Sequence, residues 1–388
     1  MNVVVTDGET RAALALTRAL GRSGHTVHVC AAQAHSLAGC SRWCAAEFLQ
    51  AGPESAPGRI AASIVQVVRS TGSRHLLAMT DRTLTALHGS GPDLGPARIP
   101  APAAQDYFRA SDKAWLFERC REWSIPVPDG MVVPGGALPE DSRLEPLGPE
   151  WVVRPALSWR WDGERWITGK VAAVRGRAEL EAHVASDPAC SHPYLVQRRI
   201  RGVGCGLFLS AHAGRLLAVF AHQRIREKPP WGGVSTLCRS TKPPADLRAW
   251  AERFVERAQW SGLAMLEFKR EAASGTALLL EINARPWGSM ALPLAAGVDF
   301  VSAWTAPERF DGARSDYAEG LRLRWWWGDV DHFYLRGKAA GRTGAGALAK
   351  AFAAALIAGP RAEVWDTFRS DDPLPFARET LSWLAPGR

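Results

Sequence analysis

Residues 265–268 read Met-Leu-Glu-Phe and residues 278–285 read Leu-Leu-Leu-Glu-Ile-Asn-Ala-Arg, with a polar break containing a Ser-Gly pair between them. Both runs are short, apolar and interrupted by a carboxylate, which is typical of two β-strands joined by a turn. Because side chains alternate between the faces of a strand, Glu281, Asn283 and Arg285 point to the same side. The sequence therefore predicts a hairpin with one polar face.

That polar face has the chemistry of a metal site. Glu267, on the first run, joins it if the two strands pair antiparallel. Two carboxylates and an amide oxygen are hard ligands of the kind that Mg²⁺ takes alongside substrate phosphates. Arg285 would then reach an anion held by the metal. The alternative is a hairpin whose polar face is simply exposed to solvent. This alternative is less favoured because both runs are otherwise strongly apolar.

Length and composition indicate a globular chain of several domains. At 388 residues the chain is too long for one ordinary core, and 47% apolar with 22% charged residues argues against extended disorder. No stretch reaches the roughly eighteen uninterrupted apolar residues of a membrane helix. Residues 1–5 have no basic leader and enter a strand directly, so we expect no secretory signal. Seven cysteines without metal-ligand spacing favour a reducing cytoplasm.

The formal charge of +8 comes from 40 arginines and 7 lysines against 39 acidic residues. The basic residues are spread over the whole length, whereas a nucleic-acid surface needs them clustered, preferably between aromatic residues. We therefore expect no nucleic-acid partner. The excess charge more plausibly serves phosphates and acidic small substrates.

The first hundred residues have the pattern of a parallel α/β sheet. A strand at 3–5 is followed by a tight turn, a helical pattern at 11–23 and a second strand at 25–29, with a further helix at 60–70 and a further strand at 75–81. The first turn offers a single glycine before the helix. A nicotinamide-binding interpretation, which needs a glycine fingerprint there, is therefore disfavoured.

The remaining chain alternates between strand and helix patterns without an internal repeat. We expect helices at 111–123, 177–186, 246–260 and 345–357, strands at 151–155 and 194–197, and a hairpin over 206–221. Segments 158–170 and 222–235 are rich in Gly, Trp or Pro and are predicted to be mobile loops suited to be lids. A polar-aromatic tail is expected over 361–383.

Four elements could converge on one nucleoside triphosphate. Lys113 opens a helix, Arg154 ends a strand beside a predicted loop, and Gln197 ends another strand before a glycine-rich turn at 201–206. The polar face of the hairpin would hold the metal.

With these residues in view, the chain resembles the ATP-grasp superfamily, and within it the branch of predicted ATP-dependent carboxylate–amine ligases, also called carboligases. The likeness covers about residues 1–305 in consistent order. The strings that carry it are Glu281-Ile282-Asn283-Ala284-Arg285-Pro286-Trp287-Gly288-Ser289, Ala296-Gly297-Val298-Asp299-Phe300, residues 222–230 and 232–235, Asp112-Lys113 and Thr6-Asp7-Gly8.

The resemblance implies a mixed α/β and α+β fold. A preATP-grasp, Rossmann-like domain would span residues 1–104, the small ATP-grasp lobe 105–192, and the large lobe with the metal site 193–306. A largely helical C-terminal extension would follow over residues 307–388.

The resemblance also implies the ligands, ATP and Mg²⁺ (or Mn²⁺), and the residues that hold them. The expected nucleotide-binding residues are Lys113, Arg154, Gln197, Arg198, Arg199, Ile200 and Gly204. The expected metal ligands are Glu267, Glu281 and Asn283, and the expected catalytic residues are Arg285, Arg226 and Lys228.

Some positions depart from the pattern or have two interpretations. The strand that usually ends in Lys-Pro ends here in Arg154-Pro155, and arginine keeps the charge. Arg198 and Val203 stand where relatives often carry acidic residues, which leaves the ribose contacts open. Arg224 is balanced between an anion contact and a solvated charge, and a structural role is favoured for His222. Asp7 and Asp81 are weaker candidates for amine binding, against turn capping.

We therefore predict an ADP-forming ligase that activates a substrate carboxylate as an acyl phosphate and couples it to an amine. The alternative within this fold is an enzyme that activates bicarbonate, like carboxylases and carbamoyl-phosphate synthetases. A nicotinamide-dependent oxidoreductase and a non-catalytic nucleotide-binding or nucleic-acid-binding protein are disfavoured. The expected partners are small carboxylate and amine substrates, with no membrane and no nucleic acid, and a homodimer is left open.

Overall fold

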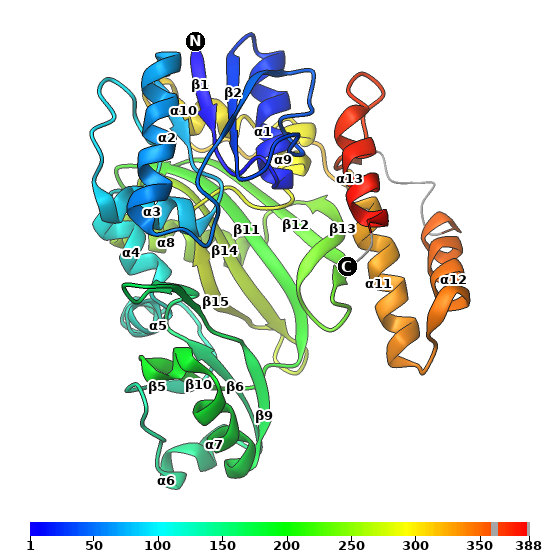
Figure 1. Ribbon diagram of the computed structural model, residues 1–388. Helices are drawn as coiled ribbons and strands as arrows, with labels where there is room; N and C mark the ends of the chain where they lie inside the picture. Colours follow the sequence, from blue (N-terminus) through cyan, green and yellow to red (C-terminus); the bar gives the residue numbers. More distant parts are fainter. Residues whose placement is uncertain (358–363, 386–388) are drawn as a thin grey trace.

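The structure is a computed structural model that describes residues 1–357 and 364–385. Figure 1 shows an N-terminal α/β unit (blue) above a long twisted sheet (green), a small lobe below it, and C-terminal helices (orange and red) along one side. This mixed architecture confirms the predicted fold class. Residues 358–363 and 386–388, which belong to the predicted extension and in part to the predicted tail, lie outside the described residues.

The N-terminal unit is the parallel sheet that the sequence predicts, with strand order β3-β2-β1-β4. Val3, Val4 and Val5 of β1 are fully buried, so they pack on both faces of the sheet. Thr80 caps α3 by accepting from the Thr83 amide, which ends the strand region earlier than predicted. The elements are β1 (Asn2–Val5), α1 (Arg11–Arg22), β2 (Thr26–Ala31), β3 (Cys44–Leu49), α2 (Pro57–Thr71), β4 (His75–Leu77) and α3 (Asp81–Ser90).

The small lobe is built on an antiparallel sheet of order β5-β10-β6-β9. Because β10 pairs with β5 and β6, this sheet extends past the predicted boundary at residue 192. The lobe and its leading helices comprise α4 (Ala104–Ser111), α5 (Lys113–Glu122), β5 (Gly130–Val133), α6 (Asp141–Leu144), β6 (Glu150–Pro155), β7 (Trp159–Trp161), β8 (Trp166–Thr168), β9 (Ala172–Arg175), α7 (Gly176–Ser186) and β10 (Tyr194–Arg198), with 3₁₀ turns at Glu145–Leu147 and Pro188–Ser191.

The large sheet has the order β15-β14-β11-β12-β13-β16-β17. Its last two strands come from the C-terminal extension, so the extension contributes to this sheet. The elements are β11 (Gly202–His212), β12 (Arg215–Lys228), β13 (Val234–Thr241), α8 (Ala245–Arg257), β14 (Gly262–Glu271), β15 (Ala277–Asn283), α9 (Ala291–Ala296), α10 (Phe300–Thr305), a 3₁₀ turn at Pro307–Arg309, β16 (Arg322–Arg324), α11 (Trp326–Ala339), α12 (Gly344–Ile357), β17 (Val364–Trp365) and α13 (Leu374–Leu384).

Both predicted mobile loops contain paired strands. Residues 158–170 contain the β7–β8 hairpin, and residues 222–235 are mostly the paired ends of β12 and β13, which leaves 229–233 as the connection. Glycine, proline and charged residues suggested loops, but cross-strand pairing outweighs that local preference. Among the described residues, no helix has both the length and the apolar content that a membrane span requires.

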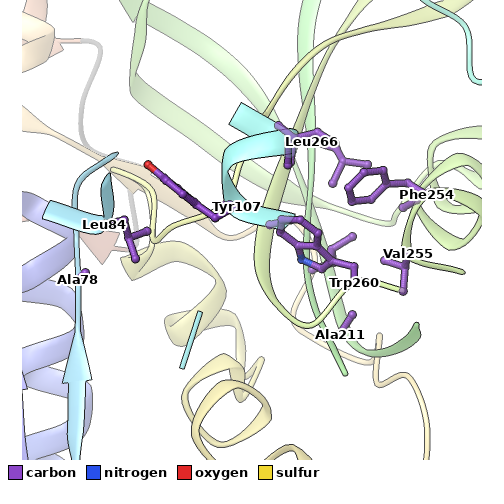
Figure 2. Packing of buried hydrophobic residues seen from close by; sticks show 14 of the residues in the cluster. Ala78, Leu84, Tyr107, Ala211, Phe254, Val255, Trp260 and Leu266 are labelled. Atoms are coloured by element: carbon purple, nitrogen blue, oxygen red, sulfur yellow. The ribbon is translucent and has the colours of Figure 1, made fainter. Parts of the chain in front are cut away.

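One hydrophobic cluster joins the N-terminal unit to the large sheet. Figure 2 shows Trp260, Phe254 and Leu266 from the large lobe packed with Tyr107 and with side chains of the N-terminal unit. Trp260 and Tyr107 are each 1% exposed. Burying aromatic side chains of this size contributes about 1.5–3 kcal/mol each, which holds the two units in one arrangement.

The same cluster positions a charged residue of the site. The Tyr107 hydroxyl donates to the backbone oxygen of Asp81 at 2.9 Å and lies 3.0 Å from the Thr85 hydroxyl. This packing places the first turn of α3, and therefore the Asp81 carboxylate, beside the large sheet.

The C-terminal extension is anchored on α1 by buried charges. The Arg18 guanidinium donates to the Asp372 carboxylate at 2.8 Å, and their side chains are only 5% and 1% exposed. Asp372 also accepts from the Ser41 hydroxyl at 2.7 Å and from the Arg42 amide at 2.9 Å. The predicted tail is therefore fixed in place over its described residues.

His222 is a buried residue of β12 and confirms the structural role favoured for it. Its ring is 3% exposed, lies edge-on to Phe208 with centroids 4.6 Å apart, and has Nδ1 3.5 Å from the Ser289 hydroxyl. Burial, and secondarily the charge of Arg224, lowers the pKa of His222 to about 3.

We predict that Asp372→Ala lowers the free energy of unfolding by about 3–5 kcal/mol, because it leaves the buried Arg18 without its counter-ion. Asp371→Ala, at the neighbouring residue, should cost less than about 1 kcal/mol, because its pair with Arg22 is exposed. Urea denaturation of both variants measures the difference. Equal losses would show that the buried pair does not anchor the extension.

We also predict a pH-dependent loss of stability from His222. Because the pKa is lower in the folded protein than the value of about 6.5 in the unfolded chain, the stability is complete above pH 6.5 and falls as the pH drops towards 3. Between pH 7 and pH 5 this residue should cost about 2 kcal/mol. His222→Asn should remove that part of the slope, whereas His212→Asn, at an exposed turn, should leave it unchanged. Identical slopes for wild type and His222→Asn would contradict the prediction.

Candidate active site

The register of β14 and β15 confirms the predicted hairpin and its polar face. Glu267 lies directly opposite Glu281 in the antiparallel pair, and Asn283 lies opposite Met265. A bulge follows Glu267, where the strand leaves the regular register. Directly opposed residues share a face of the sheet, so the two carboxylates are neighbours.

Glu281 collects cations from the small lobe. Its Oε2 accepts from an Arg154 guanidinium nitrogen at 2.9 Å and lies 3.6 Å from Lys113 Nζ. Its Oε1 accepts from Asn283 Nδ2 at 3.4 Å. Burial by itself would raise the pKa of Glu281, but Lys113 and Arg154 outweigh it and lower the pKa to about 2. The carboxylate is therefore ionised and available to a cation.

Lys113 is held at the junction of a helix and a strand. It is the first residue of α5, whose N-terminus Asp112 caps, and its amide donates to the Ala156 oxygen at 2.8 Å. Its Nζ donates to the Ser158 hydroxyl at 2.8 Å. Burial lowers the pKa of Lys113, and the charge of Glu281 opposes that shift. This lysine and Arg154 thus bridge the small lobe to the large sheet.

Glu267 is paired with Arg224, which the sequence left undecided. A guanidinium nitrogen of Arg224 lies 3.1 Å from the Glu267 carboxylate, and another lies 3.2 Å from Glu227. Strand β11 separates β12 from β14, and a side chain at Gly204 would lie 3.5 Å from Glu227 and 3.7 Å from Arg224. These are ordinary van der Waals distances, so the contact of Arg224 with Glu267 does not require a glycine at position 204. No local pattern in the sequence indicates this pair, because Arg224 reaches Glu267 across β11.

Arg285 connects the N-terminal unit to the polar face of the β14–β15 hairpin. Its Nε donates to the Asp81 carboxylate at 2.8 Å, and a terminal nitrogen donates to Asn283 Oδ1 at 3.2 Å. Asn283 is therefore oriented by two bonds, one to Glu281 and one from Arg285. Asp81 acts here as the partner of an arginine, while the Asp7 carboxylate accepts from the Thr83 hydroxyl at 2.7 Å and serves the turn.

Five of the predicted nucleotide-binding residues, from the segment that the resemblance assigns to adenine, lie where the lobes join. Gln197 and Arg198 end β10, and residues 199–201 lead directly into β11, which carries Gly204. Gln197 and Ile200 are buried, whereas the Arg199 amide donates to the Glu150 oxygen at 3.1 Å. Arg198 pairs with Glu271 at 2.6 Å and with Asp129 at 3.1 Å. Their position between the lobes is thereby established, and their contact with adenine stays a prediction.

Arg226 and Lys228 are not brought to the Glu281 cluster. Arg226 makes a two-pronged ion pair with the fully buried Asp329 of α11, at 2.9 and 2.5 Å, and Lys228 pairs with Asp331. Bulges in β12 on both sides of Arg226 break the alternation that would have placed it beside Arg224. Through these ion pairs, both residues hold α11 of the C-terminal extension against β12. Their catalytic role stays a prediction.

A cavity of about 820 Å³ adjoins the cluster at Arg285. The carboxyl ends of β1, β2 and β4 and the first turns of α1 and α3 form one side of it, which is where open α/β sheets bind ligands. The remaining walls come from residues 285–288, Trp159 of the β7–β8 hairpin, and the C-terminal residues Trp325, Arg378, Glu379 and Ser382.

No model of a known protein family and no curated protein matches the sequence. Solved structures match it over most of its length. An N5-carboxyaminoimidazole ribonucleotide synthetase in complex with ADP is 11% identical, with 87% of this chain and 85% of that chain covered and a TM-score of 0.61.

Two further structures have similar scores. The biotin carboxylase domain of 2-oxoglutarate carboxylase from Hydrogenobacter thermophilus, with MgADP and bicarbonate, is 13% identical over 83% of this chain and 73% of that chain, with a TM-score of 0.61. An L-amino acid ligase from Bacillus licheniformis is 14% identical over 78% and 73%, with a TM-score of 0.54. At these identities the likeness concerns the fold, and the protein has the ATP-grasp fold that its sequence predicts.

Proposed function

We propose that the protein is an ATP-dependent ligase that activates a substrate carboxylate as an acyl phosphate and couples it to an amine, releasing ADP and phosphate. The observation that carries the proposal is the meeting of Glu281 with Lys113 and Arg154, at 3.6 and 2.9 Å, beside Glu267 and Asn283. An array of carboxylates facing cations suits a magnesium–nucleotide complex, which contains both charges. The shared fold includes structures that hold ADP or MgADP.

The donor set of this face fits Mg²⁺. Glu267 and Glu281 are neighbours across the strands, and their side chains are 23% and 28% exposed, so an ion can reach them. The amide oxygen of Asn283 adds a third hard ligand. When bound, Mg²⁺ would neutralise charge on the β- and γ-phosphates, and Mn²⁺ is expected to substitute for it.

Charge pairing explains why the nucleotide and the metal should bind together. In the structure, Lys113 and Arg154 neutralise Glu281. When the complex binds, phosphate oxygens would pair with Lys113 and Arg154, and the metal would bind the Glu281 carboxylate. Neither exchange alone is favourable, because each leaves a partly buried charge without a partner.

The chemistry then needs positioning more than covalent assistance. An oxygen of the substrate carboxylate attacks the γ-phosphorus, the bond to the ADP oxygen breaks, and an acyl phosphate forms. The amine nitrogen attacks the acyl carbon, phosphate leaves with the bonding electrons, and the nitrogen loses a proton to solvent. We propose that Arg285 stabilises negative charge on the transferred group, and its hydrogen bonds to Asn283 and Asp81 beside the metal ligands support this role.

The β7–β8 hairpin would keep water from the acyl phosphate. Trp166 of this hairpin donates through its indole nitrogen to the Ser55 oxygen at 2.9 Å, and the Arg82 guanidinium lies 3.7 Å from the centre of the Trp159 ring. These contacts dock the hairpin on the N-terminal unit, over the cavity. An acyl phosphate hydrolyses readily, so an enzyme that forms one benefits from such a cover.

Activation of bicarbonate is the second candidate. It is favoured by one observation, the likeness to the carboxylase domain whose structure holds MgADP and bicarbonate. For either chemistry we propose a cytoplasmic enzyme of small-molecule substrates, in keeping with seven cysteines that are all free thiols. A homodimer stays a prediction.

We predict that Glu281→Gln lowers ADP release by at least about 100-fold, because it removes a charged metal ligand and the partner of Lys113 and Arg154. ADP release is measured with ATP, Mg²⁺ and a panel of amino acids and small acids. Glu252→Gln, on the exposed face of α8, is the matched control and should retain the wild-type rate. A wild-type rate in Glu281→Gln would exclude the proposed metal site.

Hydroxylamine should trap the intermediate during turnover. An acyl phosphate reacts with this strong nucleophile to give a hydroxamate, so the ligase proposal predicts hydroxamate in step with ADP and only when the organic acid is present. The hydroxamate is measured by its coloured iron complex. ADP release that depends on bicarbonate and needs no organic acid would favour the second candidate.

A further inference from the structure

The cavity beside Arg285 has a charge pattern that distinguishes two arginines from the rest of its lining. Arg11 pairs with Asp366, and Arg285 pairs with Asp81 at 2.8 Å. Among the residues that the structure describes, no carboxylate pairs with either of the other two arginines of the lining, Arg82 and Arg378.

The acidic residues of the lining are engaged elsewhere. The Glu379 carboxylate accepts from the Trp325 indole at 2.7 Å and from the Thr367 hydroxyl at 2.6 Å. Asp7 accepts from Thr83 inside the turn, as described above, and Glu9 lies exposed, accepting from the Gln33 amide at 3.0 Å. Within the described residues, the cavity therefore offers two cations that form no ion pair with a carboxylate, although the charge of Glu54 acts on Arg82 from farther away.

Arg82 is held in an orientation that suits an anion. It comes from the first turn of α3, and its guanidinium stacks on Trp159 at 3.7 Å. Its Nε is buried and has no hydrogen-bond partner among the described residues. Because this Nε is shielded from solvent, an anion in the cavity would pair with the terminal nitrogens of the guanidinium. Burial also lowers the pKa of Arg82, with Glu54 opposing the shift.

Arg378 faces the same cavity from the C-terminal extension. Its Nε donates to the His35 backbone oxygen at 2.7 Å, which fixes the side chain and leaves its terminal nitrogens for a ligand. The helix that carries it, α13, also contributes Glu379 and Ser382 to the lining. The buried pairs of Asp372 and Asp366 with α1 hold this helix against the N-terminal unit.

We propose that this cavity binds a small substrate that carries an anionic group besides the atoms that react, and that Arg82 and Arg378 pair with that group. The reacting end of the substrate lies at Arg285, beside the polar face of the β14–β15 hairpin. The anionic group lies at the walls formed by α3 and α13. The proposal rests on the ligase function proposed above and deepens it. It makes the C-terminal extension a part of the substrate site, through Arg378.

The chemical class is a carboxylate or phosphate on a small molecule. An amino acid that supplies the amine fits this class, since its own carboxylate stays free, and so does a dicarboxylic acid that supplies the reacting carboxylate. A guanidinium binds carboxylate and phosphate through paired N–H groups, and such charge-assisted bonds are among the strongest in proteins.

The test uses matched pairs of compounds that differ by one carboxylate: alanine with alaninamide, and succinate with succinamate. Inorganic phosphate serves as the free anion. Their binding to the full chain with MgADP is measured by thermal shift and calorimetry, and their turnover by ADP release. The wild type should bind the member with the additional carboxylate in at least one pair about 10- to 100-fold more tightly. Arg82→Gln and Arg378→Gln should each erase most of that preference.

Three controls separate the possible outcomes. Arg82→Lys keeps the charge and should restore part of the preference, whereas Arg22→Gln, an exposed substitution on α1, should leave it intact. Calorimetry with MgADP alone should give the wild-type Kd for both cavity variants, which shows that they are folded and that the nucleotide site is intact. The proposal is overturned if the two members of every pair bind alike, or if the preference survives both substitutions. Selective binding without any ADP release would instead contradict the ligase function.

Discussion

The contact of Glu281 with Lys113 and Arg154 is the interaction on which the arrangement of this molecule depends. The carboxylate belongs to the large sheet and Arg154 to the sheet of the small lobe, so their attraction joins two bodies with separate cores. Lys113 opens α5, whose Leu116 and Cys120 pack in the cluster shared with the large sheet. A carboxylate held this way stays ionised, with its pKa lowered to about 2. A magnesium–nucleotide complex would provide new partners for the same charges that hold the lobes in register. The contact between the lobes is therefore linked to the proposed chemistry.

Similar buried ion pairs fix the position of the C-terminal extension. Asp329 of α11 is fully buried and accepts from Arg226, Arg324 and Thr236, while Asp372 accepts from Arg18. Buried charges of this kind are weak evidence for net stability, but they specify one arrangement because any other leaves a charge unpaired. The extension is therefore seated on the N-terminal unit and on the large sheet at once. Its helix α13 closes the cavity beside Arg285 as a consequence.

The sequence predicted the site better than it predicted the loops around it. Glu267, Glu281, Asn283 and Arg285 lie together as the alternation of strands requires, and the predicted helices and strands mostly exist. Arg224 was undervalued, because it reaches Glu267 across the intervening strand β11, and the local sequence does not show which strands are neighbours. The loop interpretation of residues 158–170 and 222–235 was wrong, because local composition does not record pairing with a distant strand.

By itself the sequence determined the features that depend on local alternation, namely the α/β opening and the polar face of the β14–β15 hairpin. The resemblance to the ATP-grasp superfamily added the expectation that carboxylates and cations converge. Only the tertiary structure decided which cations of the described residues form no ion pair with a carboxylate. Arg226 and Lys228 are engaged by α11, whereas Arg82 and Arg378 are left facing a cavity. The physical reason is that a charge acts through its nearest neighbours in space, and β-bulges and long-range packing, which periodicity does not encode, choose those neighbours.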